Sequence, residues 1–155
     1  MATETATKAD TNVSGGIWKA GIVGGLAGGV VFGIMMTMMM PMIIEMAIPG
    51  MYGLGESLAV GWVIHLFHSA VLGAVFAGLV TAKPELTDST GKSIGAGIAF
   101  GVVLWVVLAT FVMPAWVGAM TPMDPSVPDV NPMSLVGHVV YGAILGGLFP
   151  LLAER

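Results

Sequence analysis

The fold is decided by two stretches of equal length that both end in Met-Pro, KAGIVGGLAGGVVFGIMMTMMMP at 19–41 and KSIGAGIAFGVVLWVVLATFVMP at 92–114. Each is long enough for a helix to cross a bilayer, which takes ~20 apolar residues. They belong to a longer match: the chain shifted by 73 residues aligns with itself without a gap and gives 15 identities over 64 positions. Roughly six would be expected by chance. We therefore predict a duplication, with repeat unit 1 at about 19–82 and repeat unit 2 at about 92–155.

The composition places the chain in a membrane. Hydrophobic residues make up 56% and charged residues 9%, whereas an ordinary soluble domain has roughly 25% charged residues. The apolar stretches are continuous and lack the alternation of a membrane barrel. We predict an all-α membrane protein, a four-transmembrane-helix bundle built from a tandem parallel repeat of two-helix units. The predicted spans are about 17–46, 57–82, 93–119 and 134–152, within a domain at 17–155 that follows a polar N-terminal tail at 1–16.

The few charged residues predict the orientation in the membrane and limit the classes of binding partner. The basic residues are Lys8, Lys19, Lys83, Lys92 and Arg155, none of which lies between the first and second or the third and fourth spans. By the positive-inside rule, both termini are predicted to be cytoplasmic in a multi-pass protein of the cell membrane. The partner is then the lipid bilayer, and the lack of a basic patch argues against nucleic acid. The absence of cysteine excludes disulfides and thiolate metal sites.

Two histidines coincide in the repeat, His65 and His138. Because each unit holds two helices, both units have the same direction in the membrane and the two histidines lie at similar depth. An ionisable residue inside a membrane is a candidate for function, and a b-type haem in a helix bundle takes one histidine from each of two helices. We predict a b-type cytochrome-like protein that binds one haem b between His65 and His138 near the outer face. Its function would be electron transfer with a quinone or another redox partner.

The helix faces around these histidines complete the haem prediction. Residues at spacings of three, four and seven share a face, and small residues beside the ligand with large apolar ones further along fit a porphyrin edge or ordinary packing. The predicted cofactor-binding residues are Ser69, Leu72, Gly73 and Phe76 with His65, and Gly142, Leu145, Gly146 and Phe149 with His138. The carbonyl groups of Gly61 and Ser134, or the Ser134 hydroxyl, would accept the second ring N–H. The outer connections contain no Arg or Lys for the propionates, which counts against haem.

Two alternatives remain open. His68 lies three residues from His65, and His65, His68 and His138 together form a candidate site for a transition metal or for protons. The 13 methionines include a run on the first predicted helix. Thioethers bind Cu(I), although methionine is more often adaptable packing. The other alternative is a structural subunit of a larger membrane complex, in which the histidines only form hydrogen bonds between helices.

Glycines predict close helix packing. Gly24 with Gly28, and Gly97 with Gly101, have the spacing that lets helix backbones approach. The first helix carries a second ridge, for which we predict a further contact with another subunit of a homo-oligomer or of a larger complex. The members of this ridge are Gly21, Gly25, Gly29 and Gly33.

The Gly-rich first helix with its terminal Met40-Pro41, together with the two histidine-bearing helices, resembles small four-helix membrane proteins of halophilic archaea. The resemblance covers about residues 15–152 and implies a four-helix membrane fold and no known activity. Such proteins are sometimes labelled histidine kinases, but nothing in 155 residues could form an ATP-binding catalytic domain. Motifs of soluble-type catalysis are absent from the sequence. The expected role is an electron carrier or subunit rather than a stand-alone enzyme.

Overall fold

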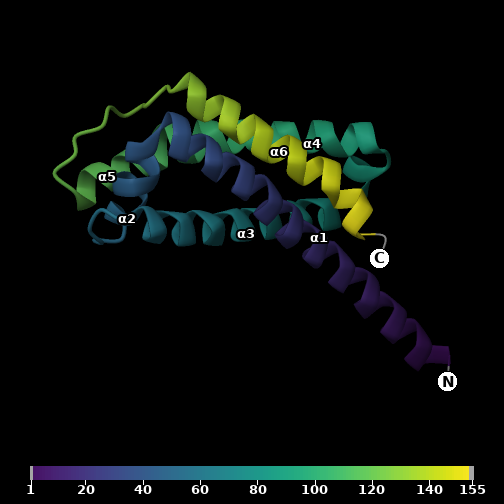
Figure 1. Cartoon of the computed structure of the whole chain (residues 1–155). Coiled ribbons are helices and arrows are strands. Elements are labelled where there is room, and N and C mark those ends of the chain that lie inside the picture. Colours follow the sequence, from purple (N-terminus) through teal and green to yellow (C-terminus); the bar gives the residue numbers. More distant parts are fainter. Residues whose placement is uncertain (1, 154–155) are drawn as a thin grey trace.

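The computed structural model of the chain describes residues 2–153, with side chains from Gly15 onward, and this part is helical apart from its connections (Figure 1). Four helices are long and apolar enough to cross a membrane, namely Gly15–Met39, Leu58–Ala82, Thr90–Met120 and Pro132–Ala153. The predicted spans are therefore confirmed to within a few residues, except that the first breaks at Met40. The elements are α1 (Ala2–Met39), η1 (Ile43–Ala47), α2 (Ile48–Gly50), α3 (Leu58–Ala82), η2 (Pro84–Thr87), α4 (Thr90–Leu104), η3 (Trp105–Val112), α5 (Met113–Met120) and α6 (Pro132–Ala153).

The helices begin at residues whose side chains accept otherwise unpaired backbone N–H groups. Ser57 and Ser89 each accept a bond of 3.3 Å from the backbone N–H three residues further on, at the starts of α3 and α4. Asn131 Oδ1 does the same for α6, with bonds of 2.9 and 3.1 Å. Such caps satisfy donors that have no partner within the helix. They fix where each span starts and thereby set the depth of the side chains along it.

α1 is the central helix of the bundle. It packs against α3 and α6, and α6 also packs against α4. A Cβ atom at Gly25 would clash with the backbone of Ser69 and Gly73 on α3. On the other side of α1, a Cβ at Gly28 would lie 2.8 Å from the carbonyl oxygen of Tyr141 on α6. The second glycine ridge therefore contacts α3 of the same chain, which corrects the prediction that it serves another subunit.

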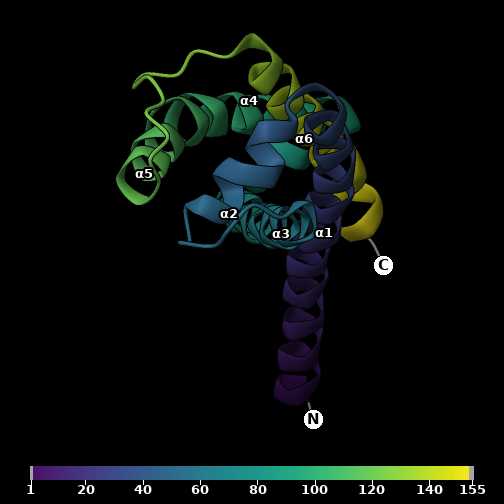
Figure 2. The same ribbon diagram turned by 60° about the vertical axis from the view of Figure 1, so that its left-hand side comes forward.

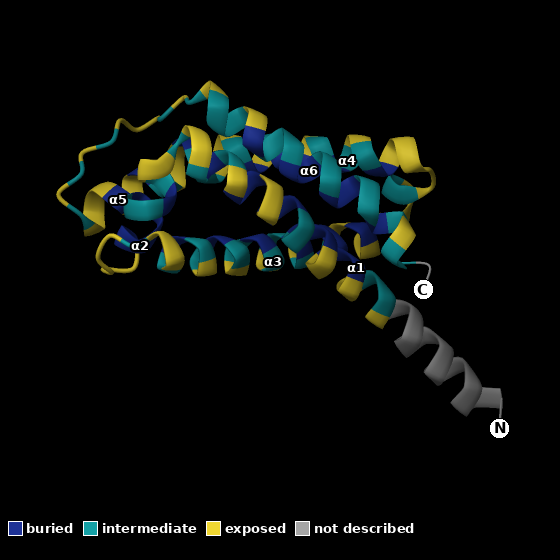
Figure 3. Cartoon of the chain, viewed as in Figure 1, coloured by how far each residue is buried: buried dark blue, intermediate teal, exposed yellow. Residues whose placement is uncertain are grey.

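α3 and α4 meet near the ends of the chain and separate toward the opposite end. The rings of Phe76 and Phe100 lie 5.5 Å apart, and Phe149 of α6 completes the cluster at 5.4 Å from Phe76. Beyond this cluster α3 and η3 diverge, and in Figure 2 α5 stands apart from α3. We call this the loop end, because the connections before α3 and α6 lie there (Figure 1). Buried residues face the neighbouring helices and exposed ones the outer surface (Figure 3), as expected for a bundle in lipid.

A proline organises the loop end. Pro114 has no N–H to donate to the carbonyl oxygen of Thr110, four residues earlier, and that oxygen accepts a bond of 2.9 Å from the backbone N–H of Asp129 instead. Trp105 Nε1 likewise donates to the carbonyl oxygen of Asn131 at 3.2 Å. The connection before α6 is thus hydrogen-bonded along η3. Since η3 is π-helical, its wider turn also moves α5 away from the line of α4.

Candidate functional site

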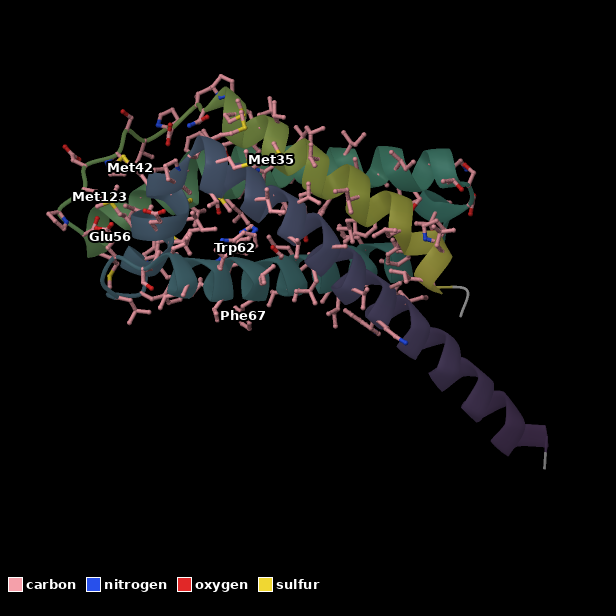
Figure 4. All side chains as sticks on the ribbon, in the orientation of Figure 1. Met35, Met42, Glu56, Trp62, Phe67 and Met123 are labelled. Carbon is pink, nitrogen blue, oxygen red and sulfur yellow. The ribbon has the colours of Figure 1, made fainter. Side chains whose placement is uncertain are left out.

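A cavity of about 330 Å³ lies between α1, α3, η3 and α6. We call it the main cavity. All three histidines of the chain line it. It reaches the outer surface between α3 and α5, where its lining residues Phe67 and Trp116 are 64% and 40% exposed. Figure 4 shows Phe67 pointing away from the bundle and Trp62 pointing into it. The opening therefore faces the side of the bundle that lipid would cover.

His138 lines the main cavity, and one of its ring nitrogens is bonded to the backbone. Its Nδ1 bonds the carbonyl oxygen of Ser134 at 2.7 Å, and a carbonyl oxygen only accepts, so Nδ1 carries the proton and donates. The neutral ring then has a free lone pair on Nε2. This confirms the predicted role of the Ser134 carbonyl group. A backbone acceptor that fixes the tautomer in this way is typical of imidazoles that bind a metal.

His65 is held in a similar way, but by the other nitrogen. Its Nε2 donates to the carbonyl oxygen of Gly29 at 2.8 Å, which leaves the lone pair on Nδ1. The prediction that the Gly61 carbonyl group accepts this bond is wrong, because the acceptor is Gly29. Gly61 instead lets α3 pack tightly against the backbone of Ile44 in η1. Within residues 15–153, no hydrogen bond reaches Nδ1 of His65 or Nε2 of His138. Two acceptor nitrogens thus remain unused at one cavity.

The ring of Phe32 packs against both imidazoles. Its centroid lies 5.6 Å from that of His65 and 4.9 Å from that of His138, both edge-on. A haem held by both histidines needs the space that this ring takes up. The bond from His65 Nε2 to Gly29 also occupies the nitrogen that suits iron in a porphyrin, since Nδ1 lies closer to the helix backbone. Haem ligation by His65 and His138 stays a prediction, and these contacts count against it.

His68 belongs to the mouth of the main cavity. The Tyr52 hydroxyl and His68 Nε2 share a hydrogen bond of 2.5 Å, and the Tyr52 ring lies 5.3 Å from that of Trp116 on α5. In the part of the chain with described side chains, no three His, Asp or Glu residues lie close enough together to hold a metal ion. The predicted site of His65, His68 and His138 alone is therefore not assembled in this conformation.

Four methionines also line the main cavity, namely Met36, Met40, Met51 and Met113. Two of them are almost fully buried, Met36 with 3% and Met51 with 5% of its surface exposed. Other methionines of the first-helix run face outward, and Met38 is 77% exposed. The methionines of the run therefore fall into one group that lines the cavity and another that faces outward. Because methionines lie on all sides of the helix, the sequence alone could not show which side would line a cavity.

The residues predicted for a porphyrin edge divide into two groups. Ser69 and Leu72 line the main cavity with the histidines, and the Ser69 hydroxyl donates to the carbonyl oxygen of His65 at 2.8 Å. The remaining six lie at helix contacts outside the cavity lining, namely Gly73, Phe76, Gly142, Leu145, Gly146 and Phe149. Sequence reasoning missed Phe32 and Asp129, and also the contact of Tyr52 with His68. Only Phe32 gave a signal, since it lies four residues before Met36 on the same helical face.

The comparisons with known proteins give a family without an activity. Residues 17–155 match a family described as "Family of unknown function (DUF6789)", and the chain belongs to this family. No curated protein and no solved structure matches the chain. The family description names neither an organism nor a kinase, so the resemblance to proteins of halophilic archaea stays a prediction.

Proposed function

We propose that this chain is a membrane-embedded binding protein for a soft monovalent metal ion, Cu(I), which it holds in the main cavity by imidazole nitrogen and thioether sulfur. The observation that carries the proposal is the chemistry of the lining. His65 and His138 each offer an unused lone pair, and four methionine side chains line the same space. Thioethers and imidazoles are ligands that suit Cu(I).

The hydroxyl donors of the wall do not compete for these lone pairs. Ser69 Oγ donates to the carbonyl oxygen of His65 at 2.8 Å, and Tyr141 Oη donates to that of Ser69 at 2.9 Å. The cavity therefore offers lone pairs and an apolar surround, which a cation with few waters of hydration can use. Thioethers are uncharged and tolerate burial, so methionine ligands cost the bundle little desolvation when the site is empty.

The fold suggests how the site arose, and we include a tandem repeat of two-helix units in the proposal. Gly25 approaches Gly73, and Gly97 approaches Gly146 in the same manner. The sequence match pairs Gly97 with Gly24 instead, one residue away. A π-helical stretch accommodates one extra residue. In the second unit η3 lies between Gly97 and Pro114, whereas in the first unit the π-helical η1 begins only after Pro41. The duplication would supply one carbonyl-bound histidine from each unit to a shared cavity.

The orientation and assembly also belong to the proposal. The basic residues support cytoplasmic termini in the cell membrane, which would put the loop end outside. Homo-oligomers or a larger complex would be built through the exposed apolar faces, for example that of α1 with Val30 and Ile34.

The lateral opening favours a second candidate, a membrane-resident quinol. Its ring would enter between α3 and α5 past Phe67, and its hydroxyls would donate to His65 Nδ1 and His138 Nε2. This candidate accounts for the two lone pairs and the opening, but it gives no role to the thioethers. For that reason we place it second.

Anaerobic titration of the purified protein with Cu(I), in competition with bathocuproine disulfonate, tests the proposal. We expect one Cu(I) per chain. Met36→Leu and His138→Gln should each weaken binding about 10-fold or more, because each removes one ligand. Met38→Leu is the matched control, since this neighbour on α1 is 77% exposed and should leave the affinity unchanged.

Four results would contradict the proposed Cu(I) site. A wild-type protein that takes no Cu(I) from the competitor excludes it, and so does equal loss of affinity in Met36→Leu and Met38→Leu. A Soret band in protein purified from haem-supplied cells, lost in both His65→Ala and His138→Ala, would establish the haem prediction instead. Quenching of tryptophan fluorescence by decylubiquinol without Cu(I) binding would favour the quinol.

A further inference from the structure

A second, smaller cavity of about 50 Å³ adjoins the main cavity at the loop end. The two share four lining residues, Ile43, Ala109, Met113 and Asp129. A cavity needs only ~10–15 Å³ to hold a water molecule. The smaller space can therefore take a single ion, and Met113 lies at its boundary with the main cavity.

Three side chains that line the second cavity can act as ligands for a soft cation. Met113 and Met123 contribute thioethers, and Asp129 contributes a carboxylate. Asp129 is the one acidic residue among the described residues that line either cavity, and neither lining contains Lys or Arg. Within residues 15–153 the carboxylate of Asp129 forms no ion pair, and the field of such a group in partly apolar surroundings attracts a cation and raises its local concentration.

Hydrogen bonds of their backbone N–H groups hold two of these ligand residues, Asp129 and Met123, in place. The backbone N–H of Asp129 donates to the carbonyl oxygen of Thr110 at 2.9 Å. That of Met123 donates to Thr121 Oγ1 at 3.1 Å, while this hydroxyl donates to the carbonyl oxygen of Val117 at 2.8 Å. Asp129 is thereby attached to η3, and Met123 to the end of α5. In Figure 4, Met123 lies toward the loop end of the molecule, where it packs against the hydrophobic core.

We propose that the second cavity is the passage by which the metal ion moves between the loop end and the main cavity. Met123 would bind the ion first, Met113 and Asp129, which line both cavities, would take it over at the boundary, and Met40 and Met36 would follow inside. Along the path the cation only changes ligands, from thioether to thioether and for part of the way also to the carboxylate of Asp129, so its own charge and oxidation state do not change. The passage rests on the proposed metal binding in the main cavity.

Stopped-flow mixing with Ag(I) tests the passage, because silver is a soft monovalent ion that needs no reductant. Binding is followed by quenching of tryptophan fluorescence, since Trp116 lines the main cavity. In Met123→Leu we expect association and dissociation both to slow about 10-fold, with an unchanged dissociation constant at equilibrium. Asp129→Asn should slow association alone and reduce its dependence on salt.

Met120→Leu is the matched control, because Met120 is 50% exposed on α5 and lines neither cavity. Unchanged rates in Met123→Leu would overturn the passage while leaving the main site intact. So would a changed equilibrium affinity in that variant, which would make Met123 a ligand of the bound state. If the wild-type protein bound neither Ag(I) nor Cu(I), the proposed function itself would fall, and the passage with it.

Discussion

At the scale of single residues, the main cavity depends on two imidazoles whose protons are assigned by backbone carbonyl groups. The sequence predicted that His65 and His138 would come together and that the Ser134 carbonyl would hold His138. It could not predict Gly29 as the partner of His65, because that contact depends on how closely α1 and α3 approach. For the same reason, it could not place Phe32 against both rings.

Tyr141 gives a prediction at this scale. Its hydroxyl joins α6 to α3 through the carbonyl oxygen of Ser69, and the residue is 3% exposed. We expect Tyr141→Phe to lower the free energy of unfolding by about 1 kcal/mol, the usual net value of one buried hydrogen bond. Circular dichroism during thermal unfolding in detergent measures the change.

Cu(I) affinity should remain the same in Tyr141→Phe, because the hydroxyl already donates to the protein. A loss of affinity without a loss of stability would instead make Tyr141 a ligand or a partner of one. Tyr52→Phe is the control for stability, since Tyr52 is 42% exposed and its loss should matter less.

At the scale of elements, close packing between helices positions the cavity lining. Most of the fold was predictable here, since continuous apolar stretches determine four helices and Met40-Pro41 the break that ends α1. The π-helical segments were not, because η3 depends on Pro114 and on the connection that bonds Thr110. The role of the second glycine ridge was also hidden, because a ridge does not show which neighbour it faces.

Two glycines of α4 provide a matched pair for testing this packing. A Cβ at Gly97 would come within 2.9 Å of Gly146, whereas one at Gly95 would meet nothing within 4 Å. We expect Gly97→Ala to destabilise the bundle by about 1–3 kcal/mol through overpacking. Gly95→Ala should be neutral or stabilising by up to about 1 kcal/mol, because alanine favours the helix.

Thermal unfolding of the two variants, measured under the same detergent conditions, decides between packing and helix propensity. Equal stability of Gly97→Ala and Gly95→Ala would mean that α4 and α6 do not approach as closely as the structure places them.

At the scale of the whole molecule, four apolar helices indicate a multi-pass membrane protein, and the proposed orientation can be tested because the chain has no cysteine. Single cysteines at Ser126 in the connection before α6 and at Glu85 between α3 and α4 would lie on opposite sides. Both positions are exposed. We expect a membrane-impermeant maleimide to label Ser126→Cys in intact cells and Glu85→Cys only after lysis.

The reverse labelling pattern would invert the topology and put the second cavity on the cytoplasmic side. The passage would then connect the site to the cytoplasm, and metal binding itself would be unaffected. Labelling of both positions in intact cells would contradict four spans.

The central claim is that imidazole nitrogen and thioether sulfur bind one metal ion together inside the membrane domain. X-ray absorption at the copper edge of the Cu(I)-loaded protein tests it most directly, because sulfur and nitrogen neighbours scatter differently. We predict both sulfur and nitrogen among the nearest neighbours of the copper, with the sulfur contribution reduced in Met36→Leu and unchanged in Met38→Leu. A copper ion surrounded by nitrogen and oxygen alone, with the same spectrum in both variants, would contradict the account.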